Sequence, residues 1–189
     1  MALPLPVSMR WDLPRWAQHL ARSHRRFSTM SERMELAVEL SRRNVAERTG
    51  DPFGAAVFDL STRRLMAVGV NVVAPSATVA AHAEVVAVCL AGVAGGHHDL
   101  RAASEGPVEL LTSCAPCMMC QGAILGSGVS SLVIAAREED TRSLGLGGSS
   151  RPPDWVQELQ RQGVAVTEDV LRTEAVAVLR EYADGGGGT

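Results

Sequence analysis

The 189-residue sequence contains no lysine, so arginine supplies every basic side chain apart from histidine. Aromatic residues make up only 4%, and four cysteines are too few for a secreted scaffold held by disulfide bonds. No apolar run approaches the ~18 residues that a membrane-spanning helix needs, and the first residues lack the sustained apolar stretch of a signal peptide. We therefore expect a cytoplasmic protein with reduced thiols and no membrane partner.

The rest of the composition is typical of one globular domain, with 46% hydrophobic and 21% charged residues. The charge is uneven, because residues 1–29 carry a net +4 from five arginines and one acid while the whole chain carries −3. We expect residues 1–29 to be a flexible basic extension and residues 30–183 to form the functional domain. Residues 184–189 are expected to be a disordered glycine-rich tail.

Hydrophobic periodicity and turn residues predict an α/β domain of three layers with a mixed five-stranded sheet. The order is a helix, a hairpin, and then alternating strands and helices. The expected strands are 55–60, 65–71, 108–112, 131–136 and 164–168. The expected helices are 31–49, 81–94, 117–125, 154–162 and 169–182.

Three of the four cysteines, Cys114, Cys117 and Cys120, fall within seven positions and form two overlapping C-x-x-C pairs. Read alone, this stretch is compatible with a disulfide, a structural zinc clip or a reaction centre. Pro116 favours Cys117 and Cys120 as the pair that binds metal, because proline fits at a helix start and poorly inside one. A helix N-terminus also favours the thiolate form. Cys114 and Cys89 are then expected to be packed, unreactive thiols.

A third ligand and a base are found in His82-Ala83-Glu84, at the start of another predicted helix. One imidazole and two thiolates are a donor set typical of zinc, and no second cysteine pair or nearby histidine pair exists to close a structural site. We predict one zinc ion per chain, bound by His82, Cys117 and Cys120. Glu84 is the predicted catalytic residue, placed for proton transfer beside the ion.

Together, His82-x-Glu84 and Pro116-Cys117-x-x-Cys120 form the H-x-E…P-C-x-x-C signature of zinc nucleobase deaminases. On these residues the chain resembles the cytidine and nucleobase deaminase superfamily over roughly residues 31–183. The stretches DPFGAAVFD, GVNVVAPSATVAAHAEVVAV and LLTSCAPCMMCQGAI are most similar to bacterial guanine deaminase and its nucleoside-deaminase relatives. This resemblance implies a three-layer α/β/α fold of the cytidine-deaminase type.

The resemblance also implies the chemistry. Zinc-bound hydroxide would attack the ring carbon that bears the exocyclic amine, and Glu84 would shuttle the proton to a ring nitrogen and then to departing ammonia. Two positions depart from the family pattern. Ala115 stands where the family has a glutamate. Guanine deaminases of this type close the pocket with an aromatic residue near the C-terminus, whereas here Tyr182 is the last aromatic residue before the terminal glycines. The residues that the resemblance implies as substrate contacts are Asn71, Phe53, Ala81, Ser113, Cys114 and Asp140.

We therefore expect a hydrolytic deaminase of a small base or nucleoside, guanine-like first and cytosine or cytidine second, that forms a homodimer as its relatives do. A tRNA adenosine deaminase is the first alternative. The −7 charge beyond residue 29 opposes it, and the basic arm is the one feature that favours nucleic-acid contact. The second alternative is a non-catalytic zinc-stabilised interaction module, which the presence of Glu84 opposes.

Overall fold

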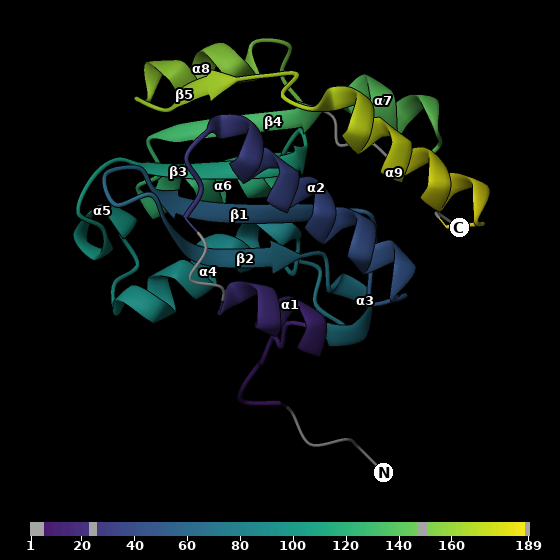
Figure 1. The fold of residues 1–189 in the computed structure, drawn as a ribbon, viewed down its shortest axis with the longest axis horizontal. Coiled ribbons are helices and arrows are strands. Elements are labelled where there is room, and N and C mark those ends of the chain that lie inside the picture. The colour runs from purple at the N-terminus through teal and green to yellow at the C-terminus, as the bar shows by residue number, and fades with distance from the viewer. Residues whose placement is uncertain (1–5, 23–25, 147–150, 188–189) are drawn as a thin grey trace.

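Five strands form one mixed sheet in the order β2-β1-β3-β4-β5 (Figure 1). The structure, a computed structural model, describes residues 6–22, 26–146 and 151–187. The sheet confirms the fold expected from the sequence. The strands are β1 (Gly54–Asp59), β2 (Arg64–Val70), β3 (Val108–Cys114), β4 (Ser131–Ala136) and β5 (Ala165–Thr167).

Strand direction places two strand ends at the same edge of the sheet. β1 is antiparallel to both of its neighbours, β2 and β3, whereas β3, β4 and β5 are parallel. β2 and β3 therefore run in the same direction, and both end at the same edge. The helices that follow these two strands begin at that edge.

Helices cover both faces of the sheet and make it the middle layer (Figure 1). Side chains of α1, α2 and α9 pack with one core cluster, and side chains of α4, α6 and α8 pack mainly with the other. Alternate strand residues feed the two clusters, as Ala56 and Phe58 do on one face and Ala55 and Val57 on the other. The helices are α1 (Arg15–Ala21), α2 (Met30–Ala46), α3 (Val73–Ser76), α4 (Ala83–Gly95), α5 (Leu100–Ala103), α6 (Met118–Ser127), α7 (Glu138–Ser143), α8 (Trp155–Arg161) and α9 (Arg172–Asp184).

The expected helices differ from the observed ones mainly at their ends. α2 begins at Met30, one residue before the expected start at Ser31, because Thr29 and Glu32 form a capping box. The short helices α3, α5 and α7 were not among the expected helices, since segments of four to six residues carry too little periodicity to be detected. No helix in the described ranges is long and apolar enough to cross a membrane.

One part of the N-terminal extension packs on the domain. Ala17 of α1 is fully buried, and Phe27 packs edge-on against Phe58 of β1 at 5.1 Å between ring centroids. Residues 6–10 are exposed and have no regular secondary structure, and residues 1–5 and 23–25 lie outside the described residues. Burial of apolar side chains, which the charge pattern does not reveal, holds α1 and Phe27 in place.

The expected glycine-rich tail also begins differently. Asp184 is the last residue of α9, and the Gly187 N–H donates to the Tyr182 carbonyl at 3.0 Å. Gly188 and Thr189 lie outside the described residues.

Ion pairs connect α7 to α9. Arg172 contacts the Asp140 carboxylate with Nε and Nη2, each at 2.9 Å, and the Arg137 backbone N–H donates to the same carboxylate at 2.8 Å. The Arg172 guanidinium lowers the pKa of Asp140, against the effect of burial. The negative charge of Asp140 therefore stabilises the folded protein above the ordinary carboxyl pKa, and this contribution is lost as the pH falls through the lowered value.

We expect Asp140→Asn to lower the free energy of unfolding by about 1 kcal/mol at pH 7, because it removes a charged pair at a partly exposed site. Urea unfolding of the metal-loaded proteins measures this difference. The difference should shrink at pH values below the ordinary carboxyl pKa of 3.8. An unchanged free energy at pH 7 would show that the pair does not hold α9.

Candidate active site

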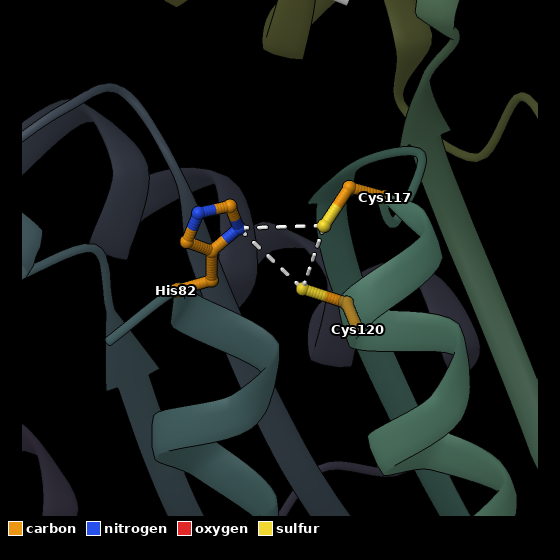
Figure 2. Close-up of side chains that lie close together, drawn as sticks. All are labelled: His82, Cys117 and Cys120. Atoms are coloured by element: carbon orange, nitrogen blue, oxygen red, sulfur yellow. Dashed lines mark hydrogen bonds between the residues drawn. The ribbon is translucent and has the colours of Figure 1, made fainter. Parts of the chain in front are cut away.

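Two helix N-termini meet at the edge where β2 and β3 end. His82 is the N-cap residue of α4, and Cys117 is the N-cap residue of α6, each with an extended backbone. Figure 2 shows the imidazole of His82 facing the sulfurs of Cys117 and Cys120 across the gap between the two helices. Because Cys117 is the N-cap, α6 begins at Met118, one residue later than expected, and Pro116 lies before the helix. The predicted separation of Cys114 from the other two cysteines is unaffected, because Cys114 is the last residue of β3.

The three donor atoms have the spacing of a tetrahedral zinc site. His82 Nδ1 lies 3.6 Å from Cys117 Sγ and 3.5 Å from Cys120 Sγ, and the two sulfurs are 3.5 Å apart. Zinc bonds of 2.3 Å to sulfur and 2.0–2.1 Å to nitrogen imply separations of about 3.5–3.8 Å between tetrahedral ligand atoms. Within the described residues, this is the cluster of histidine, cysteine and acidic side chains that could hold a metal. The donor set fits zinc.

The electrostatics of the two cysteines favour metal binding. The hydrogen bonds of Cys117 with Cys120 and His82 lower the pKa of the Cys117 thiol to about 3, against the effect of burial. The contact with Cys117 raises the pKa of the Cys120 thiol, and burial raises it further. Cysteine binds metals as thiolate, so the lowered pKa of Cys117 favours metal binding, and a bound cation would displace the proton of Cys120.

Glu84 lies beside the donor cluster, in the first turn of α4. It is 6% exposed, and its Oε2 is 3.5 Å from Cys120 Sγ. Burial raises the pKa of the Glu84 carboxyl, and the positive charge of His82 offsets part of this effect. A carboxyl group with a raised pKa can accept a proton and release it again near neutral pH. The predicted base is therefore close to the predicted metal ligands.

A cavity of about 310 Å³ opens onto this cluster, at the lower end of the size range of small-molecule sites. Of the six predicted substrate contacts, Asn71, Phe53 and Cys114 line the cavity. Burial raises the pKa of the Cys114 thiol to about 12, so this thiol stays protonated. The other residues that line the cavity are His82, Glu84, Ala115, Cys117, Thr141, Leu146 and Arg151.

The remaining three predicted contacts are not among the described residues that line the cavity. Ala81 is fully buried in the core. The Ser113 hydroxyl accepts a hydrogen bond from the Gly54 N–H at 3.0 Å, which ties β3 to the start of β1. The Asp140 carboxylate is engaged by Arg172, so the structure places this acid between α7 and α9 instead of at the cavity.

Asn71 presents a hydrogen-bond donor to the cavity. Its Oδ1 accepts the Val73 N–H at 3.2 Å, which fixes the orientation of the amide. No partner for the Asn71 Nδ2 is found within the described ranges. The amide can therefore donate to an acceptor atom on a bound ring.

Sequence reasoning missed three residues of the lining. Thr141, Leu146 and Arg151 come from α7 and from the chain between α7 and α8, which carry no recognisable motif. The guanidinium of Arg151 lies 5.3 Å from the ring centroid of Trp155 and donates to the Ala115 carbonyl at 3.2 Å. Only the packing of these segments brings them to the cavity.

Comparison with known proteins agrees with this geometry. Residues 28–136 match the sequence model of the cytidine and deoxycytidylate deaminase zinc-binding region. Guanine deaminase of Bacillus subtilis is 34% identical over 116 residues, 61% of this chain and 70% of the relative. A probable cytosine deaminase of Schizosaccharomyces pombe is 29% identical over 140 residues, 71% of this chain and 81% of the relative.

Solved structures extend the similarity to nearly the whole chain. A guanine deaminase from Nitrosomonas europaea is 39% identical, with a TM-score of 0.90 over 96% of this chain and 99% of its own. A structure in complex with 2,6-diaminopurine is 39% identical, with a TM-score of 0.89 over 96% of both chains. The chain therefore belongs to the family that shares the cytidine and deoxycytidylate deaminase zinc-binding region, and it is a zinc-dependent hydrolase that deaminates nucleobases or nucleosides.

Proposed function

We propose that guanine is the substrate of this deaminase and that the reaction releases xanthine and ammonia. The observation that carries the proposal is the placement of Phe53 and the donor amide of Asn71 around the cavity that contains Glu84. The 39% identity to a guanine deaminase over 96% of the chain supports it. An aromatic ring can stack on a flat base, and a fixed N–H donor suits the carbonyl or ring nitrogens of guanine.

In this proposal, His82, Cys117 and Cys120 hold the zinc ion. The ion supplies Lewis-acid activation of water for attack on the ring carbon that bears the amine. Glu84 accepts a proton, delivers it to the adjacent ring nitrogen, and then assists the departure of ammonia. The raised pKa of the Glu84 carboxyl, which burial causes, suits a group that must both take up and release a proton.

Cytosine or cytidine is the second candidate substrate, and the similarity to a probable cytosine deaminase favours it. Action on tRNA is opposed by the −7 net charge of residues 30–189, because phosphate backbones require basic contacts.

We further propose that the protein is cytoplasmic, in line with its unpaired thiols.

We also propose a homodimer that forms through α4 and α6. Neither helix carries an exposed charge: α6 has no ionisable group besides Cys120, and Glu84 of α4 is buried. Cys89, expected to be buried, is instead exposed on this face, and Val93 is 80% exposed. Gly122 and Gly126 leave open space on α6, which allows close approach of another helix. Helices with no polar face are normally buried, and a second copy would bury this one.

Replacement of the proposed base tests the mechanism. Glu84→Gln should lower kcat at least 100-fold, because proton transfer by a positioned carboxylate contributes about 10²–10⁴-fold. Zinc content, measured by atomic emission, should stay at one ion per chain because the three ligands are intact. Retained activity would contradict the role of Glu84. Loss of zinc would mean that the fall in kcat reports on metal binding instead of proton transfer.

Substrate identity is tested by ammonia release from guanine, guanosine, cytosine, cytidine, adenine, adenosine and tRNA. We expect kcat/KM to be highest for guanine. Replacement of Asn71 by alanine should raise the KM for guanine about 10-fold or more, because a buried polar contact of the base is lost. Turnover of tRNA alone, or of cytosine in preference to guanine, would refute the guanine proposal.

The proposed dimer is tested by a charge placed on its surface. Val93→Glu should convert the protein to a monomer in sedimentation velocity at micromolar concentration, because an unpaired carboxylate would be buried at the interface. Val7→Glu is the matched control, since Val7 is 99% exposed and lies outside α4 and α6. A wild-type monomer, or an unchanged assembly of the Val93 variant, would show that α4 and α6 do not form the interface.

A further inference from the structure

We propose that Asn44, together with Thr49 and with Trp16 of the N-terminal helix α1, positions the two residues that contact the base. This inference rests on the proposed role of Asn71 and Phe53 as base contacts. Its physical basis is a continuous chain of hydrogen bonds from α1 to the cavity wall, through residues that do not themselves line the cavity.

Asn44 joins the two segments that carry the base contacts. It is fully buried near the C-terminal end of α2. Its Nδ2 donates to the Asp51 carbonyl at 2.8 Å and to the Asn71 carbonyl at 2.9 Å. The Asn71 N–H in turn donates to the Phe53 carbonyl at 3.1 Å, so one amide group ties both segments together.

The orientation of the Asn44 amide is fixed from its other side. The Thr49 hydroxyl donates to Asn44 Oδ1 at 2.7 Å, and the Trp16 indole N–H donates to the Thr49 hydroxyl at 3.2 Å. The indole thus donates to the hydroxyl, and the hydroxyl donates to the amide oxygen of Asn44. The amide nitrogen of Asn44 then faces the two backbone carbonyls and donates to both. A reversed amide would place oxygen against both carbonyl oxygens and lose the two bonds to them.

Packing alone does not hold these segments. Behind them lies a hollow of about 970 Å³, lined in part by Thr49, Gly50, Asp51 and Val72. A Cβ atom added to Gly50 would lie 1.9 Å from the Asn71 oxygen, so the two backbones approach too closely for a side chain to fill the space between them. Hydrogen bonds to the backbone, and the Tyr182 hydroxyl that donates to Asp51 Oδ1 at 2.7 Å, add to the core contacts of Phe53 and Val72.

The chain of hydrogen bonds gives the N-terminal segment a role in the reaction. Trp16 precedes residues 28–136, which match the zinc-binding region of the family. The Arg43 guanidinium of α2 lies 4.7 Å from the Trp16 ring centroid and holds the indole over α2. The segment with the excess of arginine thus acts on substrate binding through one tryptophan, without contact between its charges and the substrate.

Matched variants of Thr49 and the tryptophans test the proposal. Thr49→Val removes the hydroxyl and keeps the shape, whereas Thr49→Ser keeps the hydroxyl. Trp16→Phe removes the indole N–H. Trp11→Phe is its control, because the buried Trp11 Nε1 has no hydrogen-bond partner within the described residues.

We expect Thr49→Val and Asn44→Ala to raise the KM for the deaminated base about 10-fold and to lower kcat less, with one zinc ion retained. Thr49→Ser and Trp11→Phe should resemble the wild type, and Trp16→Phe should raise KM about 3-fold, as loss of one neutral hydrogen bond implies. A Thr49→Ser enzyme as impaired as Thr49→Val, or equal KM values for the two tryptophan variants, would overturn the proposal.

A second measurement does not depend on the substrate. Amide hydrogen exchange in the metal-loaded protein should accelerate at Phe53, Asn71 and Val73 in the Thr49→Val variant, while the amides of β3 keep their wild-type rates. Unchanged exchange at these three amides would overturn the proposal even if guanine is deaminated. Failure of guanine deamination with accelerated local exchange would instead refute the proposed substrate and leave the positioning role intact.

Discussion

The active site depends on one constraint of the sheet: β2 and β3 are both antiparallel to the strand between them. They therefore run in the same direction and end at one edge, where α4 and α6 begin. Two strand spacings of about 4.8 Å separate the strands, which matches the 8–10 Å between packed helices. The N-cap residues His82 and Cys117 are brought within 3.6 Å of each other through this arrangement. Any other direction for β3 would place the cysteines at the opposite edge.

The sheet edge at which β2 and β3 end also determines the electrostatics of the site. Both helix N-termini point their free N–H groups and partial positive charge toward the site, which favours thiolates there. Glu84 lies in the first turn of α4 and is buried, so its carboxyl group is close to the ligand Cys120 and its pKa is raised. The proposed metal binding and the proposed proton transfer would thus share one structural cause.

The base-contacting side of the cavity is built differently. Phe53 and Asn71 line the cavity together with the ligands His82 and Cys117, and an open hollow lies against the neighbouring residues Asp51 and Val72. Asn44 connects these segments to α2, and Thr49 and Trp16 extend the connection to α1. In this protein a rigid sheet edge positions the catalytic groups, and a hydrogen-bonded chain positions the groups that would select the substrate.

Local patterns in the sequence predicted the five strands and the cluster of three possible metal ligands, and they placed Glu84, the proposed general base, close to that cluster. Cys117-x-x-Cys120 lies within one helical turn, so its spacing alone brings the two sulfurs together, and His82-x-Glu84 puts both residues at the start of one helix. Short-range rules failed where contacts are distant: Ala17 and Phe27 are buried by residues far along the chain, and Cys89 is exposed because α4 packs only one face against the sheet.

The sequence by itself determined which residues could bind zinc and transfer a proton, because donor types and helix starts are local properties. Only the tertiary structure decided what surrounds them. Asp140 pairs with Arg172, Ser113 binds the Gly54 N–H, and Thr141, Leu146 and Arg151 reach the cavity. Those outcomes depend on the pairing of β1 with β3 and on how α7, α9 and the chain before α8 pack on the sheet. Contacts between segments dozens of residues apart leave no periodic trace in the sequence.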